Sequence, residues 1–301
     1  MMIALMCMTM AAQAQLGVKR VAKLQKGDKA VYRTEQSIGA ANAAVKVTAT
    51  EQYVVTDATA DGFVVENTAT GVESDAAADD IMGTLAKKAA EVMKGITIRF
   101  STDKEGKPMA ILNGDELMKT FDERANTMVN ELHSSFPEIA QMLPKETLKK
   151  QLTEHLTTEA LLASLTENAG VFALNGKTIM TGAMDEYVND DGMKMKRMYF
   201  LTEKDASKVK VTGNINMNKE ELKSMVLKEL EENMPADQVE AVKQNIDMVM
   251  ANMKMDVKET TDYEFFPNGW LKTATTETNS EMMGQASSSK KTIECVEHSW
   301  K

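Results

Sequence analysis

The chain has few of the side chains on which common metal and disulfide sites depend. Among 301 residues it has 2 cysteines, 3 histidines and 5 prolines, and 5% of its residues are aromatic. Two cysteines cannot form a disulfide-rich scaffold or a cysteine-rich zinc site. The three histidines, His133, His155 and His298, lack a second histidine at the spacing of a metal motif. We therefore expect no metal site and no cofactor.

Recognisable catalytic motifs are also missing from the sequence. It contains no G-x-S-x-G motif, no phosphate-binding loop and no dinucleotide fingerprint. The formal net charge of −10 argues against nucleic acid or an anionic membrane surface as the main partner. We expect a protein that is not an enzyme. A hydrolase whose site is assembled from scattered residues is kept as a third alternative.

No apolar run reaches the length of about 20 residues that a transmembrane helix needs. The longest, over residues 3–12, ends in Ala12-Gln13-Ala14, which has the small-x-small pattern of a signal-peptidase site. We expect residues 1–14 to be a signal peptide cleaved after Ala14, with the mature protein exported, most simply to the periplasm. Lipidation of Cys7 is not expected, because Met6 precedes it and it lies in the middle of the apolar run. A cytosolic protein with an apolar N-terminus is the alternative.

Blocks of alternating residues and blocks of helical periodicity follow each other through the rest of the chain. Amphipathic periodicity predicts helices over 75–94, through 115–166 with breaks at Pro137 and Pro144, and over 219–232 and 235–252. Asn113 and Glu116 resemble a capping box at the start of the second block. Alternation predicts strands over 30–37, 44–56, 62–72, 96–101, 108–112, 177–188, 193–201, 208–216, 255–266, 270–280 and 288–296.

The second half repeats the plan of the first, which favours an internal duplication with halves of about 15–170 and 171–301. The segment 53–57 (YVVTD) aligns without a gap with 199–203 (YFLTE). Any β-meander shows some of this likeness, so a single unduplicated domain is the alternative. The predicted fold class is α+β: a large curved antiparallel β-sheet with amphipathic helices packed on its concave face, forming one domain over 15–301.

Methionine is unusually frequent. The chain has 25 methionines, five of them in its first ten residues. Methionine is flexible and polarisable, so it can line an adaptable apolar cavity or fill a core in place of leucine and isoleucine. The sequence leaves both interpretations open. If a cavity lies between helices and sheet, the candidate lining residues are Met118, Phe121, Leu152, Met225 and Met250.

Two motifs carry a resemblance to known proteins. The segment 26–33 reads KGDKAVYR, and the segment 263–270 reads YEFFPNGW before two long strands. With these motifs the chain resembles uncharacterised exported proteins of Gram-negative bacteria that are classed as domains of unknown function. Its architecture is more distantly similar to periplasmic lipoprotein-carrier and lipoprotein lipid-binding folds. That likeness implies a hydrophobic ligand such as an acyl chain.

Two functions therefore lead. The first is non-catalytic binding of a hydrophobic small molecule or lipid at the cell envelope, driven by apolar burial. The second is an envelope scaffold or protein-interaction module that docks another envelope protein and holds no ligand.

Overall fold

Eleven antiparallel strands form one continuous sheet in the computed structural model, in the order β6-β5-β4-β3-β2-β13-β12-β11-β10-β9-β8. The structure describes residues 17–38, 45–75, 87–88, 91–136, 144–153, 156–166, 170–188, 193–215, 217, 219–233, 239–240, 243, 246, 255–282 and 285–300. The strands of this sheet are β2 (Lys29–Ile38), β3 (Val45–Ala58), β4 (Phe63–Ser74), β5 (Thr97–Thr102), β6 (Pro108–Ile111), β8 (Met184–Val188), β9 (Lys194–Leu201), β10 (Lys208–Ile215), β11 (Met255–Phe265), β12 (Leu271–Met282) and β13 (Gln285–Ser299). The predicted α+β class with a large antiparallel sheet is confirmed.

The sheet consists of two meanders. The first strand of one meander pairs with the last strand of the other. Strands β2 to β6 form the first meander and β8 to β13 the second. The two meet where β2 pairs with β13, with Thr34 opposite Ile293 and Tyr32 opposite Cys295. Tyr53 and Tyr199, which head the two aligned segments, are buried on the second strand of their meanders, β3 and β9. Internal duplication stays a prediction.

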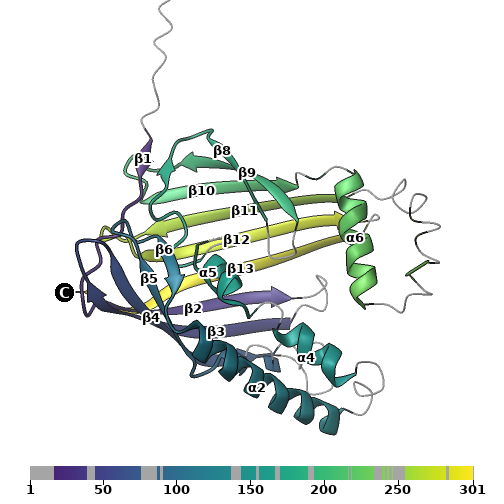
Figure 1. Ribbon diagram of the computed structural model, residues 1–301. Helices are drawn as coiled ribbons and strands as arrows, with labels where there is room; N and C mark the ends of the chain where they lie inside the picture. Colours follow the sequence, from purple (N-terminus) through teal and green to yellow (C-terminus); the bar gives the residue numbers. More distant parts are fainter. Residues whose placement is uncertain are drawn as a thin grey trace, which may run out of the picture.

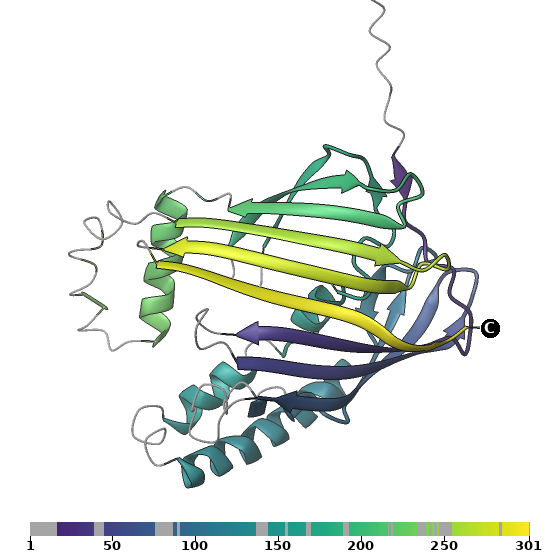
Figure 2. The same ribbon diagram turned by 180° about the vertical axis from the view of Figure 1, so that it is seen from behind.

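The two faces of the sheet differ sharply in polarity. The outward face carries ion pairs between neighbouring strands, such as Arg33–Glu294, Lys290–Glu277 and Lys272–Glu264. Alternate residues, including Tyr32 and Tyr53, are buried on the opposite, concave face. Figure 2 looks onto the convex face, where the long strands lie in front of the helices. This one-sided burial is what period-2 alternation in an antiparallel sheet predicts.

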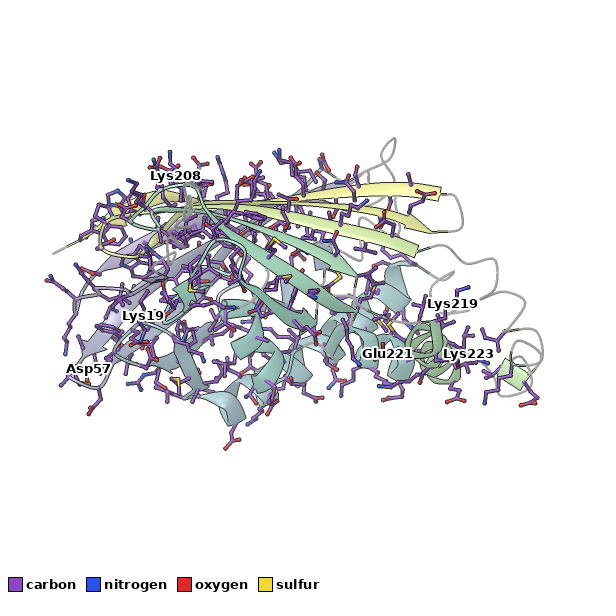
Figure 3. The ribbon with its side chains drawn as sticks, turned by 90° about the horizontal axis from the view of Figure 1, so that it is seen from above. Lys19, Asp57, Lys208, Lys219, Glu221 and Lys223 are labelled. Carbon is purple, nitrogen blue, oxygen red and sulfur yellow. The ribbon has the colours of Figure 1, made fainter. Side chains whose placement is uncertain are left out.

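Helices cover parts of the concave face (Figures 1 and 3). They are α2 (Gly114–Ser135), α4 (Lys145–Thr153), α5 (Thr158–Thr166) and α6 (Lys219–Asn233). Helix α2 buries a stripe at helical spacing: Leu117, Phe121, Ala125, Val129 and Leu132. Apart from Ala125, this stripe packs into the main core, the largest cluster of buried apolar side chains, together with residues of both meanders. Helix α6, which carries Lys219, Glu221 and Lys223, lies at the opposite end of the sheet from Lys19 and Lys208 (Figure 3).

Two local predictions differ from the structure, and three others lie wholly or mostly outside the described residues. The strand predicted over 177–188 is two strands, β7 (Thr178–Ile179) and β8, because a turn with Gly182 at φ +84° separates them. Asn113 does not cap α2 with its side chain. Instead its amide bonds strand β5, accepting from the Arg99 N–H at 2.9 Å and donating to the Thr97 carbonyl at 2.9 Å. The predicted signal peptide and most of the helices predicted over 75–94 and 235–252 lie outside the described residues.

A segment near the N-terminus, residues 17–28, joins the two meanders. Its strand β1 (Val18–Lys19) pairs with β7. The backbone of Ala22 bonds Glu105 in the first meander, and the backbone of Lys23 bonds Asn268 in the second. Arg20 is buried, with its guanidinium 3.7 Å from the centre of the Phe265 ring, and it donates to the Gly269 carbonyl at 3.2 Å. Burial lowers the pKa of Arg20 to about 10, so the guanidinium stays charged at neutral pH.

Candidate functional site: a pocket on the concave face

Residues 170–178, which form turns over 171–176, are the floor of a pocket beside the sheet. Phe172 is 2% exposed. Its ring centre lies 5.3 Å from that of Phe100, 5.6 Å from that of Trp270 and 5.9 Å from that of Tyr53. Contacts of this kind hold an aromatic side chain in one orientation. The segment is therefore anchored to the concave face by one side chain at its centre.

The backbone of this segment is strained at Leu174. Its φ is +70°, in the left-handed region that residues other than glycine seldom adopt, and its side chain is buried. The neighbouring residues keep it there. Asn175 donates from its side-chain amide to the Gly106 carbonyl at 3.3 Å. A Cβ at Gly176 would lie 3.3 Å from the Cβ of Lys107, so the turn before β6 packs closely on the segment.

A network around Asp185 forms the polar side of the site. The Asp185 carboxylate accepts hydrogen bonds from Lys177, from Arg197 Nε at 2.6 Å and Nη2 at 3.3 Å, and from the Tyr199 hydroxyl at 2.9 Å. The Arg197 guanidinium lies 4.5 Å from the centre of the Tyr187 ring. A carboxylate with this many donors is held in place, and it in turn orients the Arg197 fork.

The charges in this network stabilise each other. Burial raises the pKa of Asp185, but hydrogen bonds from Arg197 and Lys177 outweigh it and hold that pKa below its usual range. Burial lowers the pKa of Arg197, and its hydrogen bond to Asp185 more than offsets this, so the net shift is upward. Both side chains are therefore ionised at neutral pH. A carboxylate held ionised does not suit the role of a general acid, for which a raised pKa is needed.

Beside this network, Tyr187 on β8 donates from its hydroxyl to Glu259 on β11 at 2.8 Å, across strands β9 and β10. The contact crosses Gly213, where a Cβ would lie 2.9 Å from that hydroxyl. Burial, followed by the charge of Glu259, raises the pKa of Tyr187. Gly213 thus leaves room for the Tyr187 side chain over the sheet, next to Arg197.

The floor and the polar network border one pocket of about 490 Å³. Its apolar lining comes from Phe172, Leu174 and Tyr263, and its cationic lining from Lys107, Lys177 and Arg197. Both meanders contribute, because Lys107 precedes β6, while Arg197 and Tyr263 lie on β9 and β11. The volume falls within the range of small-molecule sites, about 300–1,000 Å³.

Of the five residues predicted to line a cavity, the structure describes four, and they lie away from this pocket. Phe121 is buried in the main core, and Met118 and Leu152 are partly buried against it. Met225 packs in two smaller clusters near α6. None of these four lines the pocket. Met250 lies outside the described residues.

The methionines whose side chains the structure describes are buried, partly buried as Met118 is, or exposed. Met128, Met193 and Met195 are buried among other apolar side chains, which is the core-filling role. Met109, Met180 and Met184 are exposed.

Sequence reasoning missed the pocket because its residues are far apart in the chain and look unremarkable one by one. Phe172 stood outside every predicted element, and Lys177, Asp185, Arg197 and Tyr263 fell on predicted strands. The usable signal was a phenylalanine between Gly170 and Gly176, since glycines that close together mark a turn-rich segment.

Within the described ranges, no group of three or more His, Cys, Asp or Glu side chains is placed to hold a metal ion. In the same part of the chain, no helix has both the length and the apolar character needed to cross a membrane.

Comparison with known proteins gives only distant likenesses. No family model and no curated protein matches the chain. Among solved structures, one of lipovitellin that describes lipid–protein interactions is similar with a TM-score of 0.39 and 7% identity, over 92% of this chain and 26% of that one. A porin-like protein from Bacteroides uniformis is similar with a TM-score of 0.21 and 8% identity, over 93% of this chain and 100% of that one. The chain thus spans about a quarter of the lipovitellin chain. Neither likeness is strong enough to bear on function, and the likeness to exported proteins of unknown function stays a prediction.

Proposed function

We propose that the protein binds a hydrophobic ligand, a lipid or acyl chain, without chemical change, in the pocket between the concave face and residues 170–178. The observation that carries this proposal is the pocket of about 490 Å³ with Phe172, Leu174 and Tyr263 in its lining. The strain at Leu174 supports it, because strained backbone in a well-packed protein is concentrated at sites of function.

Apolar burial supplies the driving force. Each 100 Å² of apolar ligand surface taken out of water contributes about 2.5 kcal/mol before the costs of ordering are subtracted. The segment over 170–178 is already ordered by its own turns and by the Phe172 contacts, so little further ordering of the protein is required. We place this activity in the cell envelope, on the signal-peptide pattern that ends at Ala14.

Extraction of bound lipid tests the proposal. Residues 15–301 would be exported in a bacterial host, purified without detergent and analysed by mass spectrometry for co-purifying acyl species. We expect near-stoichiometric amounts. Thr166→Trp should reduce them, because Thr166 lines the pocket at the end of α5 and a bulky ring there fills the space.

Thr120→Trp is the matched control, since Thr120 also lies on a helix and bonds a carbonyl one turn before it. It should retain the lipid. A folded wild-type protein that carries no lipid, and binds none when offered a fluorescent acyl probe, would contradict the proposal.

A second function is favoured by a different observation, the exposed apolar residues at the two edges of the sheet. Met109 is 55% exposed on β6, and Met184 is 55% exposed on β8. These are the end strands of the described sheet, and such edges can pair with another chain. If the protein is an interaction module, cross-linking should capture an envelope partner with the wild-type protein and lose it in Met109→Lys or Met184→Lys. If it binds a ligand instead, these substitutions should leave ligand binding unchanged.

A further inference from the structure

The charges that line the pocket do not balance. Lys107, Lys177 and Arg197 contribute three cations to its lining. Asp185 is the carboxylate that Lys177 and Arg197 both bond, so the polar side of the pocket carries excess positive charge. The whole chain has a formal net charge of −10. A local excess of cations inside an acidic protein favours a negatively charged ligand group at this place.

Arg197 lines the pocket and has donors that Asp185 does not use. Its Nε and Nη2 bond Asp185, which leaves donors of the five-donor fork directed elsewhere. The guanidinium lies close to two rings, 4.5 Å from the centre of Tyr187 and 5.7 Å from that of Tyr199. A planar fork held in this way loses little freedom when it binds a carboxylate or a phosphate.

Lys107 supplies a second cation from the other meander. Its stem packs over Gly176, where a Cβ would lie 3.3 Å from the Lys107 Cβ, so the side chain starts at the edge of the pocket. Its exposed ammonium can move toward a ligand without breaking the fold.

We propose that the ligand of this pocket is an amphiphile with an anionic head group, a carboxylate or a phosphate, bound by Arg197, Lys177 and Lys107, with its chain over Phe172, Leu174 and Tyr263. This inference rests on the proposed function and names the chemical class of its ligand. A free inorganic anion fits less well, because the same pocket also has apolar lining residues, and such an anion would leave them in contact with water.

Two ligands with the same chain and different heads test the head-group requirement. Delipidated protein would be titrated with palmitate and with hexadecanol at pH 8, below the concentration at which either aggregates. We expect palmitate to bind about tenfold more tightly or better. The preference should shrink as salt is raised, because screening weakens the exposed part of the attraction.

A pair of lysine variants on one turn localises the effect. Lys107→Gln should weaken palmitate binding about threefold and leave hexadecanol unchanged. Lys104→Gln is the control, because Lys104 is exposed on the same turn and does not line the pocket. Asp185→Asn should act in the opposite direction and strengthen palmitate binding relative to hexadecanol, in a protein whose circular dichroism shows that it is folded.

The outcomes separate this inference from the proposed function. Equal affinities for palmitate and hexadecanol would overturn the inference of an anionic head group. The proposal of hydrophobic ligand binding would remain. Binding of neither would overturn the proposed function itself. If inorganic phosphate competes with palmitate at equal concentration, the inference that the ligand is an amphiphile is overturned. Lysophosphatidic acid distinguishes the two heads: a preference for it over palmitate supports phosphate, and the reverse preference supports carboxylate.

Discussion

Replacing Phe172 by alanine should remove the anchor that holds the pocket floor to the sheet. Deleting a fully buried phenylalanine side chain costs about 3–5 kcal/mol in free energy of unfolding. Three aromatic rings lie with their centres within 6 Å of that of Phe172 (5.3, 5.6 and 5.9 Å), and such pairs contribute beyond simple burial. We therefore expect a loss of about 4–5 kcal/mol for Phe172→Ala, a large part of the stability of a typical domain.

Urea unfolding followed by tryptophan fluorescence measures this loss directly. The chain has 2 tryptophans, Trp270 and Trp300, whose rings stack with centres 5.5 Å apart, so the signal comes from the region of Phe172. Val296→Ala is the control, because Val296 is 47% exposed and its truncation should change stability by less than about 0.5 kcal/mol. A loss below about 1 kcal/mol for Phe172→Ala would refute the reasoning, since it would mean that residues 170–178 are not packed on the sheet.

Three further predictions follow from single residues. Burial raises the pKa of the Glu51 carboxyl group. This group therefore stays protonated to a higher pH in the folded protein than in the unfolded chain, where glutamate titrates near about 4.3. The free energy of unfolding therefore falls as pH rises through the window between the two pKa values, and Glu51→Gln should abolish that fall in urea titrations at pH 4 to 8. Gly269→Ala should cost about 1–2 kcal/mol or more, because φ is +91° there and a Cβ would lie 2.6 Å from the Ala22 Cα; an unchanged melting temperature would contradict this. Burial raises the pKa of Cys295 to about 11, so Ellman's reagent at pH 8 should modify it slowly in the folded protein and quickly in urea.

Period-2 alternation located the sheet well because one face of the antiparallel sheet is buried and the other meets water. The strand predicted over 44–56 is observed as Val45–Ala58, and the one over 208–216 as Lys208–Ile215. The prediction failed at 177–188, where the alternation continued through a turn. Gly182 was the residue that marked it, and a glycine inside an apparent strand is a reason to look for a bend.

The polar residues of the site could not be placed by the same rule. Alternation predicts which face of its own strand each of Asp185 and Arg197 occupies. It does not predict which strands lie side by side. The register that puts Asp185 opposite Arg197 was needed before their charges could be read as one network. The Asn113 side chain shows the same limit at a helix end. Its sequence context fits a cap, and tertiary contacts with β5 take its hydrogen bonds instead.

The position of the pocket explains why both halves of the chain are needed for it. Its cationic lining combines Lys107 of the first meander with Arg197 of the second. The two meanders are joined by the β2–β13 pairing and by residues 17–28, and the segment 170–178 before β8 is tied to the first meander by the bond from Asn175 to the Gly106 carbonyl. These contacts fix the distance between the turn that carries Lys107 and the strand that carries Arg197. Neither meander alone could hold the two cations over one apolar floor, so the proposed binding site is a property of the joined sheet.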